Sequence, residues 1–202
     1  MVLSCFMGLR RRPCAAPRRT HFICGVSCSP DATRVTQITL DPVGYSGQLT
    51  PLISRLTQLT TLDLSDNYFF GPIPSSISSL QLNSLSSLRR LNLSYNKLTG
   101  FLPKLPSNLL EFALRGNSLS GYVSKSTFDG LTQLEVVELS ANSFSGTLGA
   151  WFLPSLQQVD LANNSFISVE ISKPAGGNSD LVAVNLGFNE IEGNVHGLNL
   201  NM

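Results

Sequence analysis

The sequence predicts a right-handed, curved solenoid, an α/β repeat fold of about seven coils with a parallel β-sheet on its concave side. Two observations predict it. A motif of leucines, an asparagine and a glycine recurs along most of the chain, and each copy is too short to bury a core alone. Stacking solves this problem, because the apolar edge of each coil packs on the next coil. Of the 202 residues, 42% are hydrophobic, which is enough for one continuous core.

The clearest copy of the motif is residues 59–74, LTTLDLSDNYFFGPIP. Its leucines flank the polar Asp63, which is the alternation of a strand with one buried face. Asn67 follows where the strand must bend, and Gly71 marks a second bend. The run from Gly71 to Pro74 predicts a second short extended segment, with Ile73 pointing inward.

Seven copies align on the first apolar position and on the asparagine. They begin at Val35, Leu59, Leu88, Leu109, Leu134, Leu156 and Leu181. The steps of 24, 29, 21, 25, 22 and 25 residues match leucine-rich repeats, whose period is about 20–29 residues. We expect strands centred on residues 37–39, 61–63, 90–92, 111–113, 136–138, 158–160 and 183–185.

The asparagines occupy the turn that follows each strand. An amide side chain both donates and accepts, so it can satisfy backbone groups of its own turn and of the adjacent coil. We therefore interpret these residues as a structural ladder formed by Asn67, Asn96, Asn117, Asn142, Asn164 and Asn189. The glycines that follow are interpreted as turn residues with a positive φ or a close backbone neighbour.

These motifs resemble the plant-type extracellular leucine-rich repeat, L-x-x-L-x-L-x-x-N-x-L-x-G-x-I-P. Residues 59–74, 88–103 and 134–148 carry the resemblance, and CGVSC at 24–28 resembles the end of that family's N-terminal cap. Members are ectodomains of receptor-like kinases and receptor-like proteins, or secreted inhibitors of the polygalacturonase-inhibitor type. The resemblance implies a place outside the cell or at its surface.

The chain divides into four regions. Residues 1–23 form an irregular basic segment, 24–34 the remnant of an N-terminal cap, 35–195 the solenoid and 196–202 an uncapped tail. The first region is not ordered like a secretory signal, and its arginines leave a transit peptide as an alternative. No apolar segment is long enough to span a membrane. We expect a truncated chain, because a leader and a closing cap are both missing.

All the cysteines fall within the first 28 residues. This clustering predicts a disulfide-stapled cap and an oxidising compartment. The candidates are Cys5, Cys14, Cys24 and Cys28, and a pair among the last three is favoured. The spacings do not form two zinc knuckles, so neither a metal nor another cofactor is expected.

No catalytic motif is present, and the two histidines, His21 and His196, lie near opposite ends of the chain. We therefore expect a protein that is not an enzyme. After residue 34, eight Lys and Arg oppose twelve Asp and Glu, a net charge of −4. This balance argues against a nucleic-acid partner.

Three functions remain open. The first is a receptor-like ectodomain that recognises a peptide or protein ligand, or a co-receptor ectodomain. The second is a secreted inhibitor of a cell-wall-degrading hydrolase. The third is a fragment without an independent function.

In a stacked sheet, the outward residue between each inward pair recurs once per coil. The predicted ligand-binding residues on this concave face are Asp63, Arg90, Asn92, Glu138, Asp160 and Asn185. They predict a groove with a mixed-charge N-terminal part and an acidic C-terminal part, with a dip at Ala113. Such a groove suits an extended basic or polar peptide, although the same residues could simply be solubilising.

Two N-x-S/T sequons occur, at Asn92 and at Asn163. Each is a candidate for N-glycosylation in the secretory pathway. A glycan on Asn92 would cover the centre of the concave face.

Overall fold

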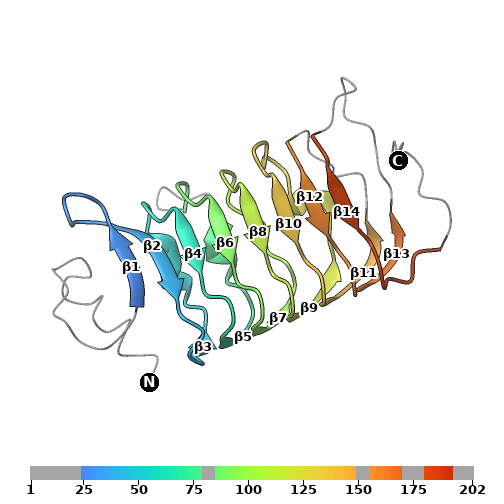
Figure 1. Cartoon of the computed structure of the whole chain (residues 1–202), viewed down its shortest axis with the longest axis horizontal. Helices are drawn as coiled ribbons and strands as arrows, with labels where there is room; N and C mark the ends of the chain where they lie inside the picture. The colour runs from blue at the N-terminus through green and yellow to red at the C-terminus, as the bar shows by residue number, and fades with distance from the viewer. Residues whose placement is uncertain (1–23, 79–84, 149–154, 170–179, 193–202) are drawn as a thin grey trace.

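The computed structural model describes residues 24–78, 85–148, 155–169 and 180–192. The chain winds into an elongated stack of coils, with β1 and β14 at opposite ends of the stack (Figure 1). Two sheets run along the stack and share one core.

The first sheet contains one parallel strand from each of the seven predicted repeats. Its order is β1-β2-β4-β6-β8-β10-β12-β14. The parallel strands are β2 (Val35–Leu40), β4 (Thr61–Asp63), β6 (Arg90–Asn92), β8 (Glu111–Ala113), β10 (Val136–Glu138), β12 (Gln158–Asp160) and β14 (Ala183–Asn185). Every strand lies where the motif predicts it, and β4 pairs in parallel with β6, with Leu62 opposite Leu91. The predicted register is confirmed.

Strand β1 (Cys24–Cys28) covers the first edge of this sheet by pairing antiparallel with β2. In the connecting loop, the hydroxyls of Ser29 and Thr33 donate hydrogen bonds to the Asp31 carboxylate. These hydrogen bonds hold the pKa of Asp31 below its usual value because they stabilise the charged form.

Cys28 is disulfide-bonded. Cys24 lies four residues away on the same strand, where Cα atoms are about 13 Å apart. A disulfide needs Cα atoms within about 7 Å, so these two cysteines do not pair with each other. The other candidates, Cys5 and Cys14, lie outside the described residues, as do residues 1–23 and the tail after residue 192.

The second sheet has six parallel strands in the order β13-β11-β9-β7-β5-β3. They are β3 (Ser46–Gln48), β5 (Tyr68–Gly71), β7 (Lys97–Gly100), β9 (Ser118–Tyr122), β11 (Ser143–Leu148) and β13 (Ser165–Val169). The second extended segment was predicted from Gly71 onward, but β5 instead ends at Gly71. Ile73 does point inward, with 5% of its surface exposed. The glycine φ values, +78° at Gly71 and +86° at Gly100, agree with the turn role predicted for this column.

Short 3-10 helices begin several return segments: η1 (Pro51–Arg55), η2 (Ser75–Ser78) and η3 (Lys125–Thr127). The Thr50 hydroxyl caps η1 by accepting the Leu52 N–H. No α-helix occurs in the described segments, so these 3-10 turns are their helical part. The 29-residue step between the second and third repeats includes residues 79–84, which lie outside the described part.

The leucine columns stack into a continuous core between the sheets. In the second coil, Leu59, Leu62 and Leu64 are each at most 2% exposed. Phenylalanines add to the core in the later coils, where Phe112, Phe128, Phe144 and Phe166 are fully buried. At the last described coil, Leu181, Val184 and Leu186 are only partly buried against this core.

The turn asparagines link each coil to the one before it. Asn96 accepts the Phe69 N–H at 2.9 Å and donates to the Leu64 carbonyl at 2.9 Å, both in the preceding coil. It also donates to the carbonyl of Leu93 in its own turn, at 3.1 Å. The Leu93 carbonyl also accepts a hydrogen bond from the side-chain amide of Asn117, in the next coil, at 3.0 Å. Equivalent hydrogen bonds occur at Asn67, Asn117, Asn142, Asn164 and Asn189.

A second feature of this turn was not predicted. The residue before each of these asparagines has a left-handed backbone, with φ between +53° and +68°. These residues are Asp66, Tyr95, Gly116, Ala141, Asn163 and Phe188. Five of them donate their N–H to a carbonyl of the next coil, as Tyr95 does to Arg115 at 2.6 Å. The inter-coil hydrogen bonds therefore hold a conformation that side chains other than glycine usually avoid.

We predict that Asn96→Ala lowers the free energy of unfolding by about 2 kcal/mol, because it leaves the buried Phe69 N–H without a partner. The urea midpoint measures this loss. Lys97→Ala is the matched control, since the adjacent Lys97 is exposed and its ammonium contacts the surface Tyr68 ring, and we expect it to change stability by less than about 1 kcal/mol. Equal midpoints for the two variants would contradict the ladder role.

Candidate ligand-binding surface

The pairing register brings most of the predicted ligand residues into one row across the first sheet. Asp63 lies opposite Asn92, Ala113 opposite Glu138, and Asp160 opposite Asn185. Asn92 also pairs with Ala113, and Glu138 with Asp160, so the row is unbroken. We call Thr39, Asp63, Asn92, Ala113, Glu138, Asp160 and Asn185 the concave row. Neighbouring members lie about 4.8 Å apart.

Arg90 lies outside this row, two residues earlier on β6. It pairs in register with Thr61 and Glu111, and its Nε lies 3.1 Å from Glu111 Oε1. Both side chains are about half exposed, at 60% and 44%. Exposed pairs of this kind contribute about 0–1 kcal/mol, so a ligand can displace one at little cost.

Four members of the concave row also form side-chain hydrogen bonds to the turn that follows their strand. The side-chain oxygens of Asp63, Asn92, Asp160 and Asn185 accept the N–H two residues later, at 3.0–3.2 Å. These are Asx turns, which offer the backbone an alternative to the sheet ladder. These four side chains therefore have a structural role in the turns as well as a place on the outward surface.

Glu138 differs from those four residues. It is half-buried in the row beside Asp160, and its carboxylate makes no hydrogen bond or ion pair with any described residue. Asp160 has one nearby cation, Arg115, at 3.8 Å. Glu138 is thus the carboxylate of the row that is free to meet a cation on a ligand.

Tyr95 and Arg115 lie beside the middle of the row, in the turns that follow β6 and β8 of the third and fourth coils. The Tyr95 ring covers Gly116, where a Cβ would come within 2.7 Å of the ring. The Arg115 guanidinium lies 5.9 Å from the centre of that ring, within cation–π range. An aromatic ring and a cation therefore border the concave row beside Ala113, which is its central residue and its smallest side chain.

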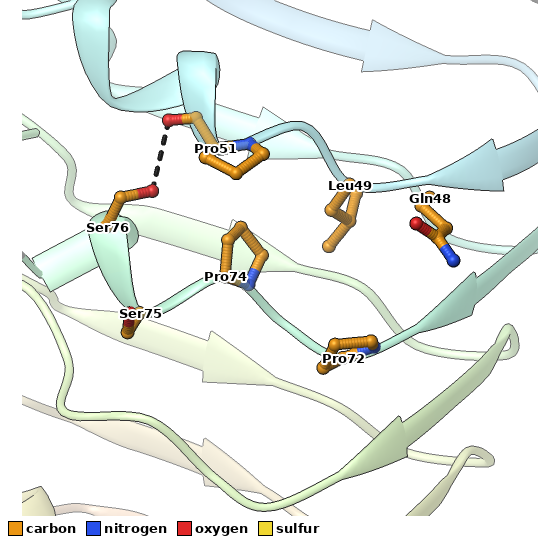
Figure 2. A pocket seen from close by; sticks show the side chains of 7 residues that line it. All are labelled: Gln48, Leu49, Pro51, Pro72, Pro74, Ser75 and Ser76. Carbon is orange, nitrogen blue, oxygen red and sulfur yellow. Dashed lines mark hydrogen bonds between the residues drawn. The ribbon is translucent and has the colours of Figure 1, made fainter.

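A cavity of about 310 Å³ lies away from the concave row, between the first two coils. Figure 2 shows Pro51, Pro72 and Pro74 around it, with the Ser76 hydroxyl donating to the Pro51 carbonyl at 3.0 Å. Gln48, Leu49, Ser75 and Ser76 complete the lining. None of these side chains carries a charge, so the cavity contains no acid, base or nucleophile activated by a neighbouring base.

Exposed aromatic rings gather on the outer face of the second sheet. Tyr68, Phe70, Phe101 and Tyr122 are 45–75% exposed, and we call them the aromatic face. The Phe101 and Tyr122 rings lie over Gly121 and Gly146 of the following coils. The Lys97 ammonium stands 4.7 Å from the centre of the Tyr68 ring. Nothing in the sequence patterns marked this face, because its rings come from positions outside the repeat motif.

Two further structural results concern only the described segments. No group of three His, Cys, Asp or Glu residues within them could hold a metal ion. No helix there is long and apolar enough to cross a membrane.

The Gly146–Tyr122 packing gives a stability prediction. Gly130 and Gly146 have similar backbones, with φ of +85° and +81°, but only Gly146 lies under a ring. Gly130→Ala should cost about 1 kcal/mol through backbone strain alone, measured by urea unfolding. Gly146→Ala should cost more, and the excess should disappear in a Tyr122→Ala background. An excess that persists without the ring would contradict this packing.

Comparison with known proteins agrees with this geometry. The Leucine Rich Repeat family model matches residues 58–80 and 87–109. Receptor like protein 27 of Arabidopsis thaliana is 33% identical over 171 residues, which cover 82% of this chain and 20% of that protein. The chain thus spans about a fifth of the length of this curated relative.

Solved structures show the same architecture. Pollen Receptor Kinase 3 superposes with a TM-score of 0.69 and 25% identity, over 88% of this chain and 83% of that one. The Arabidopsis receptor kinase HAESA, in complex with the peptide hormone IDA and the co-receptor SERK1, gives a TM-score of 0.63 and 31% identity, over 76% and 25% of the two chains. The fold defines a leucine-rich repeat protein, and the chain is similar to plant leucine-rich repeat receptor-like proteins and receptor kinases.

Proposed function

We propose that this chain is part of the ectodomain of a receptor-like protein, and that it recognises a protein or peptide without catalysis. The observation that carries the proposal is the concave row, an unbroken line of outward side chains across seven parallel strands. Its relatives include receptor-like proteins and a receptor kinase solved with a peptide hormone and a co-receptor. A place outside the cell or at its surface follows from the same relatives.

The row suits an extended peptide. Seven strands span about 29 Å, which accommodates about nine residues of extended chain. The C-terminal half of the row presents Glu138 and Asp160, whereas Arg90 near the N-terminal half is paired with Glu111. The ligand is therefore a peptide with cationic or polar side chains toward the C-terminal coils. A co-receptor ectodomain is the second partner class.

The absence of catalysis is part of the proposal. Within the described residues, the carboxylates of the row lie on an open sheet face, and the cavity beside η1 has an uncharged lining. Neither arrangement encloses a pair of acid and base groups around a substrate.

The test is charge reversal on the concave row. Glu138→Lys should weaken binding of a nine-residue lysine-containing peptide roughly tenfold. It should also flatten the dependence of affinity on salt, because the lost attraction is electrostatic. Titration calorimetry at low and high salt measures both effects. Glu138 has no partner among the described residues, so the urea midpoint should not change.

Asp129→Lys is the control, because the exposed Asp129 lies in the return segment after η3 rather than on the first sheet. It changes the net charge by the same amount and should leave the affinity unchanged. If Asp129→Lys weakened binding while Glu138→Lys did not, the ligand would bind outside the concave face and the proposed site would be wrong.

A further inference from the structure

The two sequons differ sharply in the folded protein, although the sequence presents them alike. We propose that Asn163 is the attachment site of an N-linked oligosaccharide and that Asn92 stays unmodified. This inference rests on the secretory location proposed above, but it concerns a different surface from the concave row.

Asn163 is free to accept a glycan. It is exposed in the turn between β12 and β13, and its side-chain amide makes no hydrogen bond with any described residue. Only its backbone is engaged, with its N–H donating to Gly187 and its carbonyl accepting from Asn142. Its φ is +55°, which suits asparagine because this residue tolerates the left-handed region better than most residues do. Modifying its amide therefore disturbs no contact among the described residues.

Asn92 is engaged on both sides of its amide. Its Oδ1 accepts the Ser94 N–H at 3.1 Å, and its Nδ2 donates to Asp63 at 3.3 Å. Ser94, which completes the sequon, is only 5% exposed, and its hydroxyl oxygen is buried. The transferase must reach this hydroxyl, so folding of the third coil before transfer hides it from the enzyme. The hydroxyl residue of the other sequon, Ser165, is only partly buried.

The chemistry is a transfer to the amide nitrogen. The donor is an oligosaccharide joined through its anomeric carbon to a polyprenyl diphosphate. Asn163 Nδ2 forms a bond to that carbon and loses one proton, while the bond from carbon to phosphate oxygen breaks and the lipid diphosphate leaves. No oxidant or reductant is needed, and the secretory-pathway transferase supplies the catalysis.

The glycan would stand at the edge between the two sheets. Asn163 belongs to the left-handed column, where Ala141 precedes it and Phe188 follows it in adjacent coils. Phe188 is 88% exposed, so the first sugar has an apolar neighbour to shield. This position leaves the concave row open, whereas a glycan on Asn92 would stand within it between Asp63 and Ala113.

The test uses the full chain, secreted from a eukaryotic host behind a supplied cleavable signal. Enzymatic deglycosylation in heavy-oxygen water converts each glycosylated asparagine to an aspartate that carries the heavy oxygen as a label. Peptide mass spectrometry then measures the label at each site separately. We expect label at Asn163 and none at Asn92. Ser165→Ala should abolish the glycan, Ser165→Thr should keep it, and Asn92→Gln should leave it unchanged.

Ser165→Ala leaves Asn163 itself and its backbone bonds untouched, so loss of the glycan cannot be attributed to a misfolded turn. Label at Asn92, or none at Asn163, would overturn the proposal. Because the signal is supplied, neither result bears on where the natural protein resides. The peptide affinity of the concave row is measured independently.

Discussion

The fold depends on one constraint: most coils bend out of the first sheet after a strand of three residues, and the buried backbone groups at that bend need partners. The asparagine amide meets this need for two coils at once. Asn96 satisfies an N–H and a carbonyl of the coil before it, and a carbonyl in its own turn. Because the Leu93 carbonyl also receives Asn117, the hydrogen bonds form a ladder along the solenoid. An isolated coil would lack the partners that its neighbours supply.

Side chains on the surface proposed to bind ligand likewise satisfy backbone groups at the bends. Asp63, Asn92, Asp160 and Asn185 each use one side-chain oxygen to accept an N–H of the turn that follows their strand. The second polar atom of Asn92 also donates to Asp63 in the neighbouring coil. A substitution there alters both the turn and the surface. Ala113 and Glu138 make no such side-chain hydrogen bond to the turn, so a substitution there does not affect the end of the strand.

Much of the fold could be predicted because the motif is periodic. The seven strands, the inward leucines and the turn glycines all follow from residue types at fixed spacing. The strands lie where they were expected, as do the turn glycines of the described coils and the leucine columns, which are only partly buried in the last coil. The left-handed residue before each asparagine could not be predicted in this way. Asp66, Tyr95, Gly116, Ala141 and Phe188 share no residue type, and inter-coil backbone hydrogen bonds accompany their common conformation at the first four.

The sequence by itself determined the class of fold and which side chains face outward, because alternation and repeat length are local properties of the chain. Only the tertiary structure decided which outward polar groups are free. Asn92 and Asn163 both lie in sequons, yet Asn92 donates to Asp63, 29 residues earlier in the chain, while the Asn163 side chain meets no described partner. The physical reason is that the side-chain hydrogen bonds between coils join residues far apart in the chain, from 19 positions for Leu98 and Asn117 to 44 for Arg89 and Gln133. Such contacts exist only once the coils have stacked.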